Sequence, residues 1–183
     1  WGQRRGPPDI GGQLPDRGIV RRRRRCGGWV NVLFADEQDE PIVTDELLML
    51  AELVLVVEGL DDDTGVALVL IDEQQMAELN EAHMGREGPT DVLSFPIETA
   101  SPGSPPTRPA GGPPVELGDV FIAPSVVRRN AERQGVGFED EMALMVVHGL
   151  LHLLGWDHEN EADANRMESR ERELLGRIGR VRP

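Results

Sequence analysis

The order of hydrophobic and polar residues along the chain follows two different periods. Residues alternate in Trp29–Ala35, a stretch rich in β-forming side chains. Alternation with this composition is typical of a strand. Three further short apolar runs, bounded by turn-forming residues, predict strands at Gly65–Ile71, Val92–Pro96 and Gly118–Pro124.

Five other segments carry the composition and end signals of helices. The fourth begins at Phe138 and is apolar on nearly every face from Met142 onward, so we expect it to be the buried central helix. The last is charged at most positions and is expected to pack through one apolar edge at Met167, Leu174 and Leu175. The predicted helices cover residues 45–58, 73–83, 126–134, 138–154 and 162–177.

Residues that favour helix ends mark several of these boundaries. Thr44 and Ser125 are candidate caps of the first and third helices, and Asp72 with Gln75 forms a capping-box pattern ahead of the second. Gly135 is expected to end the third helix. Because strands and helices interleave without strict alternation, the pattern favours an α+β fold: a single domain with a mixed four-stranded sheet packed with about five helices.

Length and composition separate one domain from its flanking segments. A chain of 183 residues suffices for one domain with a core, which we assign to residues 29–176. Within it, residues 98–116 are rich in Pro and Gly and are expected to form a flexible surface insertion. Residues 1–28 are interpreted as a disordered or non-native extension, and residues 177–183 as a C-terminal tail.

The charge of the chain is unevenly distributed. Its net charge is −14, yet residues 1–28 carry eight arginines against two aspartates, which leaves −20 on the remainder. Nucleic-acid binders usually display a basic footprint, and the body of this protein does not. Any contact with RNA would therefore be local, metal-assisted or helped by a partner. The basic segment itself is either a solvated tail or an arm for RNA.

Two further features indicate the compartment. Cys26 is the single cysteine, so no internal disulfide can form, and a reducing, cytoplasmic location is the default expectation. The longest apolar run, Leu47–Val57, is interrupted by Glu52 and is far shorter than the roughly 20 residues that a membrane span needs. We therefore expect no membrane partner.

Three of the four histidines stand in one short stretch, "HGLLHLLGWDH". His148 and His152 are four residues apart and would lie on one face of the central helix. Gly155 can end that helix in a left-handed turn, after which His158 could arrive as a third ligand. Three imidazoles with a fourth position left for water are the arrangement of a catalytic zinc, and we expect one Zn²⁺ per chain.

The alternative is that two of these histidines are ordinary core residues and the third is a surface residue. A buried imidazole without a polar partner costs about 1–3 kcal/mol, which favours metal binding. Zinc proteases of the H-E-x-x-H kind need a glutamate directly after the first histidine, where this chain has Gly149. Hydrolysis of an RNA phosphodiester by a zinc-bound water, or attack by the RNA 2′-hydroxyl, requires no such residue.

The stretch also contains one carboxylate, Asp157. It could orient a ligand histidine or take up a proton, or it is a solvated residue of the turn.

Three segments of the sequence resemble those of a known family. The histidine stretch is similar to the H-G-x-L-H-L-x-G-x-D-H signature of the YbeY family, bacterial endoribonucleases also described as UPF0054-type metalloproteins and rRNA maturation factors. "LNEAHMGREGPTDVLSFP" resembles the family's L-N-x2-Y-R-x4-P-T-[DN]-V-L-S-F-P block, and "ELGDVFIAP" its L-G-D-I segment. The resemblance covers roughly residues 30–176, with the three blocks in order.

The resemblance implies one zinc held by His148, His152 and His158, and cleavage of single-stranded RNA. It further implies a role in 16S rRNA 3′-end maturation and ribosome quality control, with rRNA and the small ribosomal subunit with its assembly proteins as partners, and no DNA. Thr90, Asp91 and Ser94 would border the metal cleft and contact the substrate.

One position departs from the family pattern. Met84 stands where the family commonly has an arginine proposed to help bind or cleave RNA. Arg86 could take over that catalytic role beside Asp157, or it is a solvated loop charge. Two other functions stay open at this point: a non-catalytic, metal-stabilised ribosome assembly factor, and a metallohydrolase of peptides or small molecules.

Overall fold

A computed structural model describes residues 31–60 and 64–183. The extension at residues 1–28 and the start of the first predicted strand at Trp29 lie outside the described residues. The elements in chain order are β1 (Asn31–Asp36), α1 (Thr44–Val57), β2 (Gly65–Leu70), α2 (Glu73–Met84), β3 (Val92–Pro96), β4 (Glu116–Ile122), α3 (Pro124–Gln134), α4 (Phe138–Leu153) and α5 (Glu161–Gly176).

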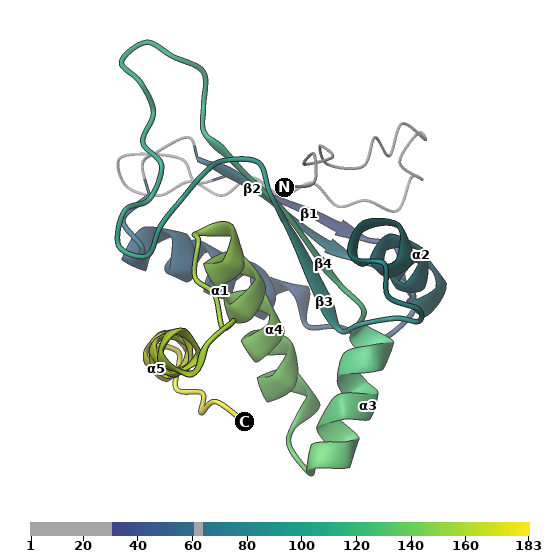
Figure 1. The fold of residues 1–183 in the computed structure, drawn as a ribbon. Helices are drawn as coiled ribbons and strands as arrows, with labels where there is room; N and C mark the ends of the chain where they lie inside the picture. Colours follow the sequence, from purple (N-terminus) through teal and green to yellow (C-terminus); the bar gives the residue numbers. More distant parts are fainter. Residues whose placement is uncertain (1–30, 61–63) are drawn as a thin grey trace.

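The four strands form one mixed sheet in the order β1-β2-β4-β3. β1 pairs in parallel with β2, and β2 in parallel with β4, whereas β3 runs antiparallel to β4 at the edge (Figure 1). Ser94 of β3 is opposite Val120 of β4. This α+β arrangement of a four-stranded mixed sheet with five helices in the described chain confirms the predicted fold class.

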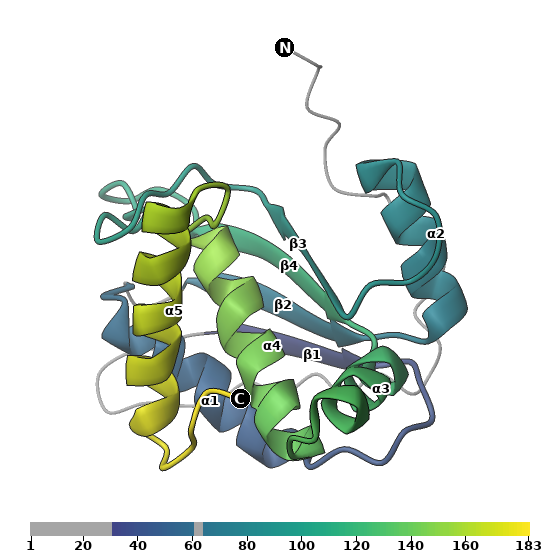
Figure 2. The same ribbon diagram turned by 60° about the horizontal axis from the view of Figure 1, so that its bottom comes forward.

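The two faces of the sheet are covered by different helices. α1, α4 and α5 lie on one side and α2 on the other (Figures 1 and 2). Alternation along each strand sorts the side chains accordingly. In β4, Val120 belongs to the larger core under α4, whereas Phe121 belongs to a smaller cluster with Met76 of α2 and Leu93 of β3. The sheet therefore separates the residues of α2 from those of α4.

The helix-end predictions had mixed outcomes. The capping box at Asp72 and Gln75 is confirmed, with the Gln75 N–H donating to Asp72 Oδ1 at 2.9 Å. Gly135 ends α3 in the left-handed region, with φ 70°. The caps predicted at Thr44 and Ser125 are wrong.

The two wrong caps have local reasons. Thr44 is already the first residue of α1, whose N-cap is Val43 without a side-chain bond. α3 begins one residue before Ser125, because Pro124 at its first turn has a φ suited to a helix and no N–H to satisfy. β4 starts at Glu116 and ends at Ile122, two residues earlier at both ends than predicted.

Two segments outside the regular elements bear on the site. Residues 97–115, most of the predicted insertion, connect β3 to β4 and contain no strand or helix, apart from an isolated bridge between Ser101 and Ser104. The segment after α5 is held by ion pairs of Arg180 and Arg182. None of the described helices combines the length and the apolar composition that a membrane span requires.

Candidate metal centre

The three histidines are positioned by the end of α4. His148 and His152 lie one helical turn apart, α4 ends at Leu153, and Gly155 just beyond it has a φ of 81°, in the left-handed region. A Cβ atom at Gly155 would lie 2.2 Å from the carbonyl oxygen of Ala100, so the approach of the β3–β4 connection also requires glycine there. The turn brings His158 back toward the helix, as the sequence predicted.

The imidazoles converge on one point. One ring nitrogen from each of His148, His152 and His158 can be chosen so that all three lie within 4.8 Å of one another. The His148 and His152 rings are half-buried, while His158 is exposed, so the group opens to solvent on the His158 side. These residues form a group that could hold a metal ion, as predicted.

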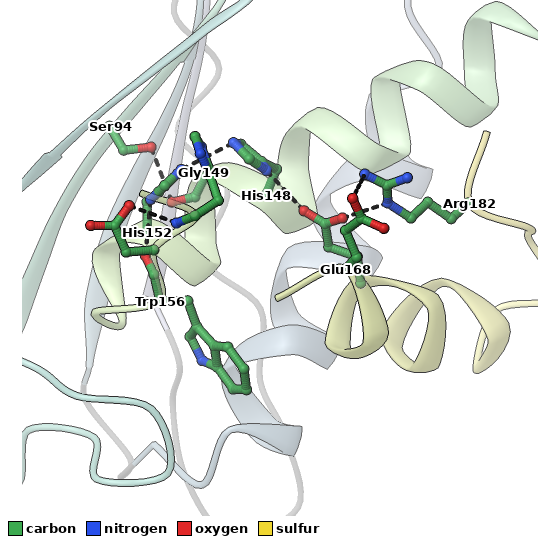
Figure 3. Close-up of polar contacts among 10 residues, drawn as sticks. Ser94, His148, Gly149, His152, Trp156, Glu168 and Arg182 are labelled. Carbon is green, nitrogen blue, oxygen red and sulfur yellow. Dashed lines mark hydrogen bonds and ion pairs between the residues drawn. The ribbon is translucent and has the colours of Figure 1, made fainter. Parts of the chain in front are cut away.

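The remaining ring nitrogens are fixed by acceptors. The Nδ1–H of His152 donates to the carbonyl oxygen of Trp156 at 3.0 Å, because a carbonyl can only accept. The Nδ1 of His148 lies 2.8 Å from Glu171 Oε1 (Figure 3). An ionised carboxylate also only accepts, so His148 carries its proton on Nδ1 as well. In a neutral ring this arrangement leaves Nε2 as the nitrogen that can bind a metal.

The two Nε2 atoms lie 3.0 Å from each other. Burial, and then the neighbouring His148 and His158, lower the pKa of His152 to about 4, so its ring is neutral near pH 7. A contact this short needs a cation between the two nitrogens, which can be a shared proton or a metal ion. Zinc bonds imidazole nitrogen at about 2.0–2.1 Å, which separates tetrahedral ligands by roughly 3.4 Å. The arrangement therefore fits a metal ion of this kind.

Glu171 was not predicted from the sequence as a site residue. It lies on α5 between Met167 and Leu174, on the edge predicted to be apolar, and only 1% of it is exposed. Burial alone would raise the pKa of Glu171, but hydrogen bonds from His148 and Arg182 outweigh it and leave that pKa below its ordinary value. The available signal was a glutamate within a buried helix edge, which in general requires a partner.

Gly149 faces the sheet and not the histidine cluster. A Cβ atom there would lie 2.5 Å from Val120 Cγ1 and 3.3 Å from Ser94 Oγ. The Ser94 hydroxyl donates to the Gly149 carbonyl at 3.0 Å. Close packing of α4 on β3 and β4 thus accounts for the glycine, and a glutamate at this position would not fit. Ser94 is next to the centre through this backbone bond.

Thr90 and Asp91 are engaged with α3. Thr90 Oγ1 donates to Asp91 Oδ1 at 3.1 Å, and Asn130 Nδ2 donates to Asp91 Oδ2 at 2.9 Å. Together with Arg129 and Arg133 these residues line an open cleft. Asp91 also contributes, after burial, to a raised pKa of Glu141, which lies on α4 two turns before His148. The cleft therefore lies beside the N-terminal half of the histidine-bearing helix.

The two proposed catalytic residues differ in their surroundings. The exposed carboxylate of Asp157 accepts a hydrogen bond from the His158 N–H at 2.6 Å, and its charge acts to raise the pKa of His152. Asp157 is thus beside the histidines. Arg86 is exposed in the loop after α2, two residues beyond Met84, whose exposed fraction is 46%. Its guanidinium makes no ion pair with another residue of the described ranges.

Comparison with known proteins identifies the family. The family model described as "Endoribonuclease YbeY" matches residues 33–179, most of the chain. The chain belongs to the YbeY family.

Relatives in this family are similar over nearly their whole length. "Endoribonuclease YbeY" of Rhodopseudomonas palustris is 34% identical over 175 residues, which cover 94% of this chain and 89% of that protein. The protein of the same name from Thermobifida fusca is 40% identical, over 80% of this chain and 92% of its own. The resemblance inferred from the three sequence blocks is confirmed.

A solved structure supports the same fold. The solution structure of TM1509 from Thermotoga maritima is similar with a TM-score of 0.51 and 25% sequence identity, covering 81% of this chain and 91% of that one. The α+β architecture of this YbeY family member therefore has an experimentally determined counterpart.

Proposed function

We propose that this protein is a zinc-dependent endoribonuclease that cleaves single-stranded RNA during rRNA maturation. Membership of the YbeY family supports the endoribonuclease activity. The observation that carries the metal dependence is the convergence of His148 Nε2 and His152 Nε2, 3.0 Å apart, with His158 completing the group.

The chain's own residues would divide the work between them. Zinc, held by the three histidines, would supply a Lewis acid and make a water molecule more acidic at neutral pH. Glu171 and the Trp156 carbonyl, bonded to the two Nδ1 atoms, would hold the His148 and His152 rings with Nε2 available to a metal. Asp157, exposed beside His158, is the candidate to accept or return a proton.

RNA contacts are proposed for residues on either side of the centre. Arg86 would meet a phosphate, and Thr90, Asp91 and Ser94 would border the bound strand. Maturation of the 16S rRNA 3′ end, a part in ribosome quality control, association with the small subunit and a cytoplasmic location are likewise proposals, supported by the three sequence blocks of the family. The acidic body, at −20 outside residues 1–28, is consistent with a partner that supplies positive charge.

The surroundings of Gly149 count against a peptidase. The glutamate that zinc proteases place after their first histidine would collide with Val120 here. General-base catalysis of that kind contributes about 10²- to 10⁴-fold, so peptide hydrolysis would be handicapped. Phosphodiester cleavage depends more on charge stabilisation and can use the RNA 2′-hydroxyl.

Cleavage of single-stranded fragments of the 16S rRNA 3′ region tests the proposal. The wild type should cleave them and leave a single-stranded DNA of the same sequence intact. His152→Ala should lose the activity, and so should the chelated wild type until zinc is restored. His83→Ala is the matched control, because His83 lies on α2 against Phe95, across the sheet from the site. This variant should remain active.

Each contrary outcome has a distinct meaning. Cleavage that survives removal of the metal would overturn the proposal. Co-sedimentation with the small subunit without any cleavage would indicate an assembly factor. Hydrolysis of casein would indicate a hydrolase of another class.

A further inference from the structure

A chain of polar contacts leads from the histidine cluster to the segment after α5. His148 Nδ1 is 2.8 Å from Glu171 Oε1, and Arg182 Nε is 2.6 Å from Glu171 Oε2. The contacts thereby join α4, α5 and the C-terminal segment, and Figure 3 shows His148 and Arg182 at the two ends of this run of contacts. A weaker ion pair of 3.8 Å joins Arg182 to Glu168.

Glu171 is a buried charge with two partners. Its side chain is 2% exposed, so it has little access to water, and each carboxylate oxygen is bonded to one of these two residues. A buried carboxylate with both oxygens engaged is held in position and in its ionised form. If Arg182 were removed, the His148 imidazole would be the one remaining hydrogen-bond partner of the Glu171 carboxylate among the described residues.

We propose that Arg182 is a positioning residue of the metal centre that acts through Glu171. By fixing the carboxylate, Arg182 sets the ring orientation of His148 and keeps the proton on Nδ1, so that Nε2 is presented to the metal. The proposal rests on the proposed function only in assuming that the histidines bind zinc.

The same segment offers a matched control. Arg180 is also an ion-pairing arginine, with Asp140 of α4 at 2.5 Å and Glu46 of α1 at 2.7 Å. It anchors the C-terminal segment to the body without contacting Glu171 or a histidine in the described structure. Arg180→Gln and Arg182→Gln therefore both release one anchor, but only the second removes a partner of Glu171.

Zinc affinity measured by competition with a chromophoric chelator on the full-length protein is the main test. Partners of metal-bound histidines typically contribute 10- to 100-fold to metal affinity, and Glu171→Gln should weaken zinc binding by about that factor. Arg182→Gln should weaken it in the same direction by roughly tenfold or less, and Arg180→Gln should leave it unchanged. Arg182→Lys, which keeps a cation, should recover part of the loss.

The double variant tests whether Arg182 acts through Glu171. In the Glu171→Gln background, Arg182→Gln should have no further effect on zinc affinity, because the charge it holds is already gone. Thermal unfolding of the metal-free variants shows whether each one still folds, so that a loss of affinity is not mistaken for a loss of structure.

The outcomes separate this inference from the proposed function. Equal zinc affinities for wild type and Arg182→Gln would overturn the inference alone. The same holds if Arg180→Gln matches Arg182→Gln, or if the two losses add in the double variant. A wild type without measurable zinc affinity would overturn the proposed metal site and this inference with it.

Discussion

Gly149 has a meaning that only its surroundings reveal. In the sequence it marks the absence of a protease glutamate, whereas in the structure it allows α4 to pack closely on β3 and β4. Gly149 can be read from the sequence, but its neighbours Val120 and Ser94 are 29 and 55 residues away along the chain. Long-range packing of this kind cannot be derived from a local pattern.

Gly149→Ala should destabilise the fold. The added methyl group would lie 2.5 Å from Val120 Cγ1, a fully buried side chain with little freedom to move. Overpacking of this type typically costs about 1–3 kcal/mol. The free energy of unfolding from urea titration measures the loss.

Gly176→Ala serves as its control. Gly176 is also helical, at the end of α5, and nothing lies within 4 Å of an added Cβ atom. There alanine should be neutral or stabilising by up to about 1 kcal/mol, because it favours a helix more than glycine. Equal effects at the two positions would refute the packing account of Gly149.

The histidines and Glu171 show how much of the site the sequence could predict. The spacing of His148, His152 and His158 around Gly155 was sufficient to predict their convergence, since a helix and one turn determine it. Glu171 could not be assigned to His148, because the angle at which α5 packs on α4 is not encoded in either helix alone. Local geometry was predictable, and its tertiary support was not.

The helices and strands show the same contrast: local interactions could be predicted from the sequence, and long-range ones could not. The capping box of α2 was predicted correctly because Asp72 and Gln75 interact within one turn. Ser125 was predicted wrongly because Pro124 competes for the start of α3. The edge position of β3 follows from pairing across the long β3–β4 connection, a choice that the strand sequences leave open.

The first turn of α4 contains Glu141, a buried glutamate. Its burial outweighs the stabilisation that a helix N-terminus gives to a negative charge. Negative charge suits a helix N-terminus, yet Glu141 is 4% exposed, and burial, followed by the charge of Asp91, raises its pKa. The folded protein then holds this proton more tightly than the unfolded chain does. Ionisation of Glu141 consequently lowers the free energy of unfolding as pH rises from the ordinary carboxyl pKa, about 4.3, through the raised one.

Glu141→Gln should remove this pH-dependent cost. The variant should gain stability relative to wild type as pH increases above about 4.3, and the gain should level off once Glu141 is ionised in the wild type. Urea unfolding across a pH series measures the free energy of unfolding of each protein. Subtracting the wild-type value from that of the variant cancels the contribution of groups that titrate alike in both. Glu139→Gln removes an exposed charge from the same turn. If Glu139→Gln gained as much stability with rising pH as Glu141→Gln, the burial of Glu141 would not be the cause of the gain.

For the whole molecule, a bound metal would link folding to ligand concentration. The three histidines come from α4 and the turn after it, so they converge only in the folded chain. A ligand that binds only the native state stabilises it by about 2.7 kcal/mol at 100 times its dissociation constant.

Adding a chelator to the zinc-loaded protein should therefore lower its melting temperature. His152→Ala should show a much smaller change, because one ligand is missing. Differential scanning calorimetry with and without chelator makes the comparison. An identical shift in wild type and variant would mean that the chelator acts elsewhere on the protein.

The contact between Ala100 and Gly155 divides the β3–β4 connection into a root and a free part. The root lies against the turn that carries His158, while the remainder projects beyond the sheet (Figure 1). Nothing lies within 4 Å of a Cβ atom added at Gly111, so a purification tag or fluorophore inserted there would meet no packed neighbour in the described chain. A label on the Ala100 side would sit at the turn itself. The connection thus offers both a neutral attachment point and a reporter position on a single loop.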